Sequence, residues 1–157
     1  MKEIKLMNKG LKQLGSKVPI GKDPKKIILE KLNNPYNKEK YVIRFSIPEF
    51  TSLCPITGQP DFAKIYIDYV PKNWIVESKS LKLYIQSYRN VGIFHEDVIV
   101  SIGKKLLKEI KPIWIRIGGY FYPRGGIPID VFWQSGKTPA FLWIPDQNVN
   151  IYSGRGN

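Results

Sequence analysis

The alternation of apolar and polar positions predicts two long strands in the first half of the chain. Residues 41–47 (YVIRFSI) are rich in β-branched and aromatic side chains, and Pro48 is expected to end this strand. Residues 63–70 alternate with a period of two, which indicates a second strand that pairs with the first as a long hairpin. The loop between the strands, residues 49–60, carries Cys54.

The next segment, residues 80–88, fits both an alternating and a helical spacing of apolar side chains. We favour a helix, because Ser78 or Ser80 can supply the oxygen that caps its first turn. Asn90 and Gly92 then provide a signal for its end.

Residues 95–110 form the clearest predicted helix. Its apolar positions recur at helical spacing and share one stripe, which consists of Val98, Ile102, Leu106 and Ile110. Pro112 prevents continuation of this helix. Aromatic and β-branched residues then predict strands at 114–122 and 127–133, on either side of a glycine-containing turn at 123–126.

The order of these elements is ββααββ, which predicts an α+β fold with an antiparallel sheet covered by helices. An open sheet has free edges, and these invite pairing between subunits. Residues 1–35 are rich in lysine, glycine and proline. They are expected to form a basic N-terminal arm with a short helix near residues 27–32, followed by a single domain at residues 36–157.

Basic residues outnumber acidic ones by 25 to 13, so the formal net charge is +12. Such an excess attracts polyanions, for example nucleic acid or the phosphates of a cofactor, although any single lysine is more often part of a solvated face. No apolar run is long enough to span a bilayer, and the first residues lack the apolar stretch of a secretory signal. A cytoplasmic protein is therefore expected.

The single cysteine and single histidine limit the chemistry of the chain. They exclude an intrachain disulfide and the four-ligand set of a structural zinc site, and no metal is expected. Cys54 lies among turn-forming residues, where its thiol can be presented to a substrate, although a small buried side chain is the common role of a free cysteine. Asp61, at the start of the next strand, can exchange a proton with a thiol or close a turn.

Two further groups of polar residues are candidates. The imidazole of His95 could relay protons, and the carboxylate of Glu96 could accept N–H donors from a guanine-like edge. Taken alone, this pair is better explained as a half-buried histidine and a glutamate that interacts favourably with the positive end of the helix dipole. Positive charge that suits a phosphorylated cofactor is provided by Lys79, Lys82 and Arg124. No glycine-rich phosphate loop accompanies them.

Several short stretches, taken in order, resemble the motifs of the QueF family, the 7-cyano-7-deazaguanine reductases of the tunnelling-fold (T-fold) superfamily. The most specific is residues 77–84 (ESKSLKLY). The others are residues 49–55 (EFTSLCP), 58–62 (GQPDF), 94–97 (FHED) and 123–127 (PRGGI). The resemblance covers about residues 40–135 and implies a T-fold, in which an antiparallel sheet carries two helices packed on one face.

By this resemblance Cys54 is the nucleophile that adds to the nitrile carbon of 7-cyano-7-deazaguanine and forms a thioimide. Asp61 matches the general acid that protonates the nitrile nitrogen, and His95 matches a residue that assists proton movement. Reduction of a nitrile to an amine takes four electrons, hence two hydrides from NADPH. The implied product is 7-aminomethyl-7-deazaguanine, a precursor of the tRNA base queuosine.

The same resemblance assigns the binding residues. Glu96 matches the carboxylate that anchors the purine, while Glu77 and Ser78 are expected to shape the floor of the pocket. The positions implicated in holding NADPH are matched by Lys79, Lys82 and Arg124.

The short, unrepeated chain resembles the unimodular members of the family. This implies a homo-oligomer of stacked rings, a decamer, with active sites between subunits and no direct binding of tRNA or of a membrane. Archaeal relatives share the fold and the cysteine but act as amidinotransferases, and they lack the octapeptide at residues 77–84. A basic nucleic-acid-binding domain is the other alternative, supported by the net charge and by Gly-Arg-Gly at residues 154–156.

Overall fold

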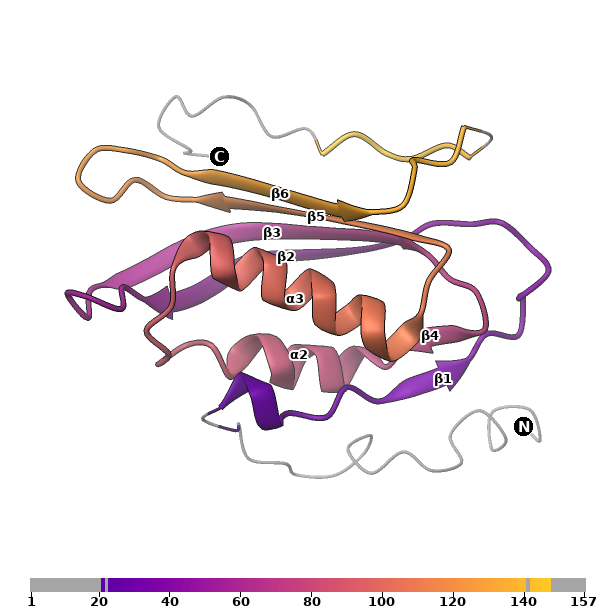
Figure 1. The fold of residues 1–157 in the computed structure, drawn as a ribbon, viewed down its shortest axis with the longest axis horizontal. Coiled ribbons are helices and arrows are strands. Elements are labelled where there is room, and N and C mark those ends of the chain that lie inside the picture. Colours follow the sequence, from indigo (N-terminus) through magenta and orange to yellow (C-terminus); the bar gives the residue numbers. More distant parts are fainter. Residues whose placement is uncertain (1–20, 22, 141, 148–157) are drawn as a thin grey trace.

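A computed structural model describes residue 21, residues 23–140 and residues 142–147 of the chain. Figure 1 shows the elements in this part of the molecule. In chain order they are η1 (Pro24–Lys26), β1 (Lys31–Asn33), β2 (Ile43–Leu53), β3 (Pro60–Val70), β4 (Trp74–Val76), α2 (Ser78–Gln86), α3 (His95–Ile110), β5 (Trp114–Phe121) and β6 (Asp130–Ser135).

The main sheet is antiparallel throughout, with strand order β2-β3-β5-β6. Its long hairpin, β2 and β3, places Ser52 opposite Asp61 and Phe50 opposite Ala63. The short strands β1 and β4 pair as a second, two-stranded sheet. The order of elements along the chain therefore contains the predicted ββααββ arrangement, to which the two short strands β1 and β4 are added.

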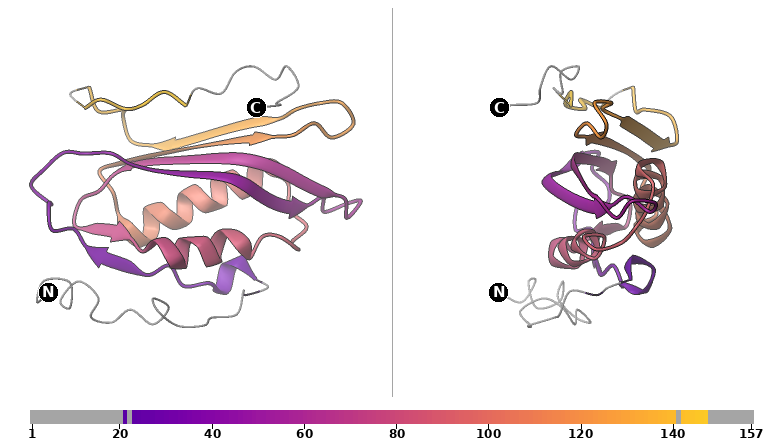
Figure 2. Two further views of the ribbon diagram at one scale, coloured as in Figure 1. Left: turned by 180° about the vertical axis from the view of Figure 1, so that it is seen from behind. Right: turned by 90° about the vertical axis from the view of Figure 1, so that its left-hand side faces the viewer.

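Both helices cover the same face of the main sheet, as the two views in Figure 2 show. α3 has the predicted bounds, and its apolar stripe is buried in the core: Val98, Ile102, Leu106 and Ile110. Gly119 of β5 lies so close to α3 that a Cβ atom there would collide with Ile99. The predicted α+β fold, an antiparallel sheet with two helices packed on one face, is confirmed.

Strand boundaries differ most from the sequence prediction around Pro48. β2 does not end there; it continues to Leu53, and the register with β3 shifts between Ile47 and Phe50. Proline has no N–H for a ladder hydrogen bond, and a bulge lets the edge strand pass this position and resume pairing. The predicted loop at residues 49–60 is therefore only a tight turn after Leu53.

α2 begins two residues earlier than predicted, because a different residue caps it. The Glu77 carboxylate accepts hydrogen bonds from the N–H groups of Lys79 (2.8 Å) and Ser80 (2.7 Å). Neither Ser78 nor Ser80 supplies the cap oxygen, since the Ser80 hydroxyl donates to the Glu77 carbonyl instead. The helix ends at Gln86, ahead of the predicted stop signal.

Residues 23–35 contain structure that the sequence pattern did not predict. The short helix expected near residues 27–32 does not form; β1 pairs there with β4, so tertiary pairing overrides the local pattern. Leu29 of this segment is buried in the core. Residues 1–20 of the predicted arm, and residues 154–156 of the basic tail, lie outside the described residues.

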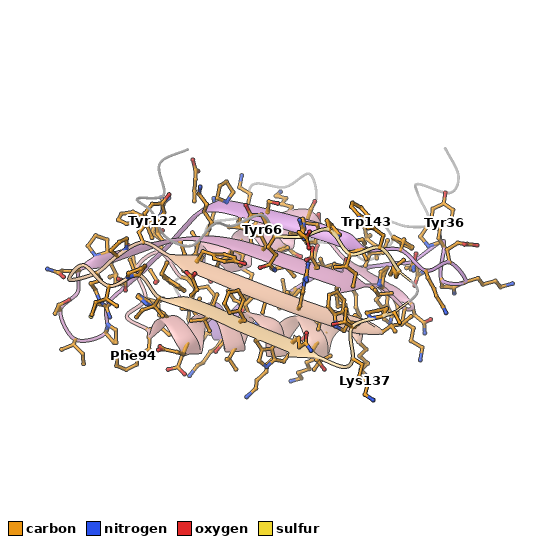
Figure 3. The ribbon with its side chains drawn as sticks, turned by 90° about the horizontal axis from the view of Figure 1, so that it is seen from above. Tyr36, Tyr66, Phe94, Tyr122, Lys137 and Trp143 are labelled. Atoms are coloured by element: carbon orange, nitrogen blue, oxygen red, sulfur yellow. The ribbon has the colours of Figure 1, made fainter. Side chains whose placement is uncertain are left out.

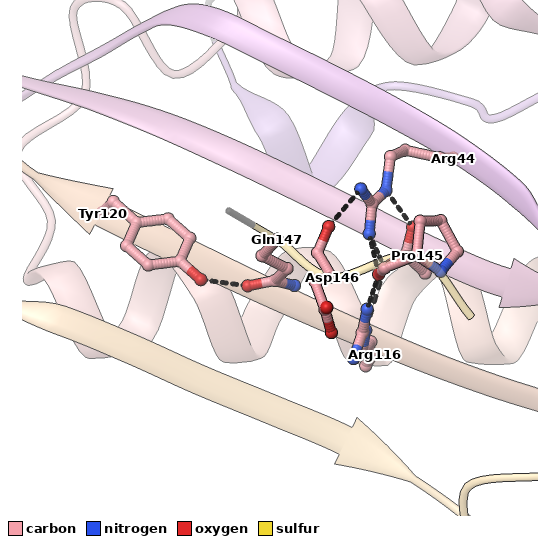
Figure 4. Close-up of polar contacts among 7 residues, drawn as sticks. Arg44, Arg116, Tyr120, Pro145, Asp146 and Gln147 are labelled. Carbon is pink, nitrogen blue, oxygen red and sulfur yellow. Dashed lines mark hydrogen bonds and ion pairs between the residues drawn. The ribbon is translucent and has the colours of Figure 1, made fainter. Parts of the chain in front are cut away.

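The face of the sheet away from the helices carries a buried charge. Asp68 of β3 has no exposed surface and accepts hydrogen bonds from Nε of Arg44 (2.6 Å) and Nε of Arg116 (2.8 Å). Both guanidinium groups also donate to the Pro145 carbonyl oxygen, each at 2.6 Å. Figure 4 shows Pro145 and Asp146 beside the two arginines, and the Gln147 side chain at the Tyr120 hydroxyl. The last described segment is thus joined to the sheet through this charge cluster.

Candidate active site

Cys54 occupies the turn that joins β2 and β3. Its N–H donates to the Gln59 carbonyl at 2.8 Å, and its own carbonyl accepts from the Gly58 N–H at 3.0 Å. Gly58 has a φ of 69°, a left-handed conformation that suits glycine. The cysteine is 6% exposed. The turn therefore holds the thiol in a defined place just below the surface.

Thr57, which the sequence did not mark as a candidate, lowers the pKa of the Cys54 thiol. Its hydroxyl has the largest influence, and the backbone N–H groups of Thr57 and Ile56 add to it. The Thr57 N–H donates to Sγ at 3.5 Å. Partial burial raises the pKa, whereas the Arg124 guanidinium lowers it further. A lowered pKa increases the fraction of thiolate, the nucleophilic form, at neutral pH.

The connection between α2 and α3 is bonded to the end of β2, beside Cys54. The Leu53 N–H donates to the Val91 carbonyl, and the Ile93 N–H donates to the Leu53 carbonyl, both at 3.0 Å. Gly92 allows this approach, since a Cβ atom there would lie 3.1 Å from the Cα atom of Pro55. These bonds bring the start of α3, and with it His95, to the hairpin turn.

Asp61 and His95 meet beside this turn. Nε2 of His95 lies 3.2 Å from Oδ2 of Asp61, and both side chains are almost fully buried. The imidazole stacks on the Phe121 ring of β5, with a centroid separation of 4.0 Å and an interplanar angle of 13°. This stacking fixes the plane of the imidazole and directs its edge to the carboxylate.

Arg124 pairs with Asp61. Its Nη1 donates to Oδ2 at 2.9 Å and to Oδ1 at 3.1 Å. The arginine comes from the turn between β5 and β6, where Gly125 and Gly126 have φ values of 60° and 81°. From its charge and from the family resemblance it is predicted to hold NADPH with Lys79 and Lys82, and the structure brings it to the Asp61 carboxylate.

Some buried polar atoms of this site have no hydrogen-bond partner within the described part of the chain. They are Ser52 Oγ and both ring nitrogens of His95, since Nε2 lies near Asp61 without the alignment of a hydrogen bond. Ser52 is fully buried and lies opposite Asp61 in the hairpin. Buried polar atoms of this kind are usually satisfied by water or by a ligand. Ser52 is a second residue that the sequence reasoning missed.

The remaining predicted residues, with the exception of Glu96, form a separate group on α2 and at its N-cap. Glu77 is buried as the helix cap, while Ser78 and Lys82 are exposed and Lys79 is partly exposed. Glu96 follows His95 in the first turn of α3 and is exposed. The structure thus brings Asp61, His95 and Arg124 together beside the Cys54 turn and places the α2 residues elsewhere.

Two grooves flank the bulge of β2, and Pro48 and Glu49 belong to the walls of both. The first has a volume of about 300 Å³, and its wall includes Ser78 and Lys82. The second has a volume of about 530 Å³, and its wall includes Phe62, Arg89 and Tyr122. Figure 3 shows Tyr122 at the same end of the sheet as Phe94, the residue before His95. Both volumes lie in the range of small-molecule sites.

Two features are absent from the described residues. Among them no helix is long and apolar enough to cross a membrane. Across the same ranges, no group of three or more His, Cys, Asp or Glu side chains is placed to hold a metal ion.

A thiol of lowered pKa beside a buried carboxylate and imidazole, on an α+β scaffold, is an arrangement that resembles the sites of enzymes with a cysteine nucleophile. The fold itself matches that of a solved structure described as the archaeosine synthase QueF-Like in the apo form. The TM-score is 0.59 at 24% identity, and the match covers 64% of this chain and 99% of the other. This likeness confirms the predicted T-fold.

The sequence comparisons are more specific. The family model described as QueF-like protein matches residues 60–140. A protein of Parvibaculum lavamentivorans is 62% identical over 94% of this chain and 96% of its own length. A protein of Paracoccus denitrificans is 60% identical over 94% of this chain and 96% of its own length. Both relatives are named NADPH-dependent 7-cyano-7-deazaguanine reductase. The chain belongs to the QueF family, as its motifs predicted.

Proposed function

We propose that this chain is an NADPH-dependent reductase that converts the nitrile of 7-cyano-7-deazaguanine into the amine 7-aminomethyl-7-deazaguanine, for queuosine synthesis. The observation that carries the proposal is the 62% identity, over 94% of the chain, to a relative named for this activity. The geometry supports it, because a thiol of lowered pKa, a carboxylate and an imidazole lie together at the end of one hairpin.

In the proposed reaction Cys54 supplies the nucleophile. Its sulfur adds to the nitrile carbon: the S–C bond forms, one π bond of the nitrile breaks, and the nitrogen takes a proton to give a thioimide. Asp61 is the proposed donor of that proton, and His95, whose Nε2 lies 3.2 Å from Oδ2 of Asp61, is proposed to relay protons to it. The tether through sulfur keeps the substrate in place for reduction.

Substrate binding is proposed for the second groove and its surroundings. Glu96 would accept N–H donors of the purine edge from its place next to His95. The unpartnered atoms of Ser52 and His95 offer sites for polar substrate atoms or a water. Glu77 already accepts two backbone N–H groups, so its part is to hold the pocket floor together with Ser78.

The lysines of α2 are proposed to hold NADPH, which supplies the hydrides. Lys82 lies in the wall of the first groove, and Lys79 precedes it by one turn of the helix. The free N-terminal N–H groups of a helix often bind phosphate, but here Glu77 occupies two of them. The lysine side chains are therefore the better fit for the 2′-phosphate.

The test of this function is the nitrile-dependent oxidation of NADPH, followed by absorbance together with the amount of amine formed. We expect two NADPH to be consumed for each nitrile. A T-fold amidinotransferase would instead turn over with an ammonia source and no nicotinamide. A basic nucleic-acid-binding domain would give neither reaction.

Replacement of Thr57 by valine is expected to raise the pKa of the Cys54 thiol towards its ordinary value, because the hydroxyl that most lowers this pKa is lost. The thiolate then forms at higher pH, so alkylation by iodoacetamide slows severalfold at neutral pH and recovers in alkaline buffer. The measurement is the alkylation rate as a function of pH. If Thr57→Val and the native protein gave the same profile, the Thr57 hydroxyl would not be the group that lowers the pKa of Cys54.

Replacement of Lys82 by alanine is expected to raise the KM for NADPH about 10-fold, with a smaller effect on kcat. A charge-assisted hydrogen bond to phosphate contributes enough free energy for a change of about this size. NADH, which lacks the 2′-phosphate, serves as the control cofactor in the same steady-state assay. An equal rise in KM for both cofactors would argue against contact with that phosphate.

We further propose a homo-oligomer, a decamer of stacked rings, in the cytoplasm. In the described part of the chain, β2 and β6 form the two edges of the main sheet, each paired on one side only. Such edges are available for pairing between subunits. The substrate is a free base, so no direct contact with tRNA is required. Light scattering coupled to gel filtration tests the size of the assembly.

A further inference from the structure

We propose that Arg124 is a positioning residue for Asp61 in the covalent step, a role distinct from holding the cofactor. The inference rests on the proposed reaction. Nη1 of Arg124 donates to both oxygens of the Asp61 carboxylate, at 2.9 and 3.1 Å. An arginine side chain does not lose its proton in a protein, so Arg124 is the donor in both contacts.

The groups around Asp61 come from three elements, and Arg124 makes the only aligned hydrogen bonds to the carboxylate that involve a side chain of the described residues. Nε2 of His95, at the start of α3, lies 3.2 Å from Oδ2 of Asp61 without the alignment of a hydrogen bond. Ser52 of β2 lies opposite, but its buried hydroxyl has no partner. The Asp61 side chain is only 4% exposed, so loss of its donor leaves a buried acceptor with fewer partners.

Loss of the guanidinium would therefore change the direction in which Asp61 presents its oxygens. A buried carboxylate without its donor turns towards the remaining polar groups, here His95 and the Ser52 hydroxyl. Proton transfer to the nitrile nitrogen depends on the carboxyl group being aligned with it. Arg124 thus acts on the first chemical step, before any hydride is needed.

The experiment separates this role from cofactor binding by leaving NADPH out. Native protein and variants are mixed with 7-cyano-7-deazaguanine, and formation of the thioimide is followed by its ultraviolet band. Arg124→Gln is expected to slow adduct formation about 10-fold to 100-fold, the size of effect seen when a catalytic group is misplaced. Arg124→Lys, which keeps the charge, is expected to recover part of the rate.

Lys82→Gln removes a positive charge from α2 and provides the contrast. It is expected to raise the KM for NADPH without slowing adduct formation. If Arg124→Gln behaves in the same way, with a native rate of adduct formation, Arg124 is a cofactor residue and the proposal is overturned. If the native protein forms no adduct, the proposed function fails instead, so the two failures are distinguishable.

A double-variant comparison tests whether Arg124 acts through Asp61. The protein with both Asp61→Asn and Arg124→Gln is expected to form the adduct no more slowly than Asp61→Asn alone, because the group that Arg124 positions is already disabled. Rate losses that multiply in the double variant would show that Arg124 acts independently, and would overturn the proposal.

Discussion

Replacement of Cys54 by alanine is expected to lower nitrile-dependent NADPH oxidation by at least about 10⁴-fold, as the loss of a covalent nucleophile does in other enzymes. The chain has no second cysteine, so no other thiol can form the adduct. The assay is the absorbance of NADPH with saturating nitrile.

The control for this variant is its fold. The hydrogen bonds that fix the turn, to Gln59 and from Gly58, involve only the backbone of residue 54, so Cys54→Ala should keep the native melting temperature within a few degrees. It should also still bind the nitrile by calorimetry. Retention of more than about 1% of the native rate in this folded variant would contradict covalent catalysis by Cys54.

Replacement of Asp68 by alanine is expected to lower the free energy of unfolding by about 3 kcal/mol. Asp68 is fully buried between Arg44 and Arg116, and removal of one partner from a buried ion pair leaves uncompensated charge. The value is at the low end for such a loss, because both arginines are partly exposed and keep the Pro145 carbonyl as acceptor. Urea unfolding at a fixed protein concentration measures the change.

A matched control is Glu39→Gln, which removes an exposed carboxylate. Surface substitutions of this kind usually change the free energy of unfolding by less than about 0.5 kcal/mol. A change for Asp68→Ala as small as that of the control would show that the cluster on the outer face of the sheet does not stabilise the fold.

The parts of the fold that could be predicted from sequence are those with a long, regular pattern. α3 was predicted to the residue, because a sustained apolar stripe runs between an acidic first turn and Pro112. β1 and β4 have three residues each, too few to show a period, and form only because they pair with each other. The continuation of β2 past Pro48 depends on a β-bulge, and the general tendency of proline to end strands does not predict it.

The candidate site was predictable in its residue types but not in its contacts. Cys54, Asp61 and His95 could be marked from turn context and motifs, and the motifs also led to the family, which the comparisons confirm. The meeting of Arg124 with Asp61 depends on the order of strands in the sheet, so neither the charge of Arg124 nor the resemblance that grouped it with the lysines predicted this contact. The catalytic and binding roles of all these residues stay predictions.

The two residues that sequence reasoning missed differ in how they could have been found. Thr57 follows Cys54 within one tight turn, where hydroxyl side chains often bond to nearby groups, so the turn itself carried a signal. Ser52 has no such signal. Its position opposite Asp61 follows from the register of the hairpin, which only the folded chain defines.

The most direct test of the central claim is the mass of the intact protein after incubation with 7-cyano-7-deazaguanine in the absence of NADPH. We expect the native chain to gain the mass of one nitrile substrate and to lose it again when NADPH is added. The Cys54→Ala variant is expected to show no gain in mass. A native chain that consumes NADPH with the nitrile but never carries the added mass, even at the shortest times, would contradict a thioimide on Cys54.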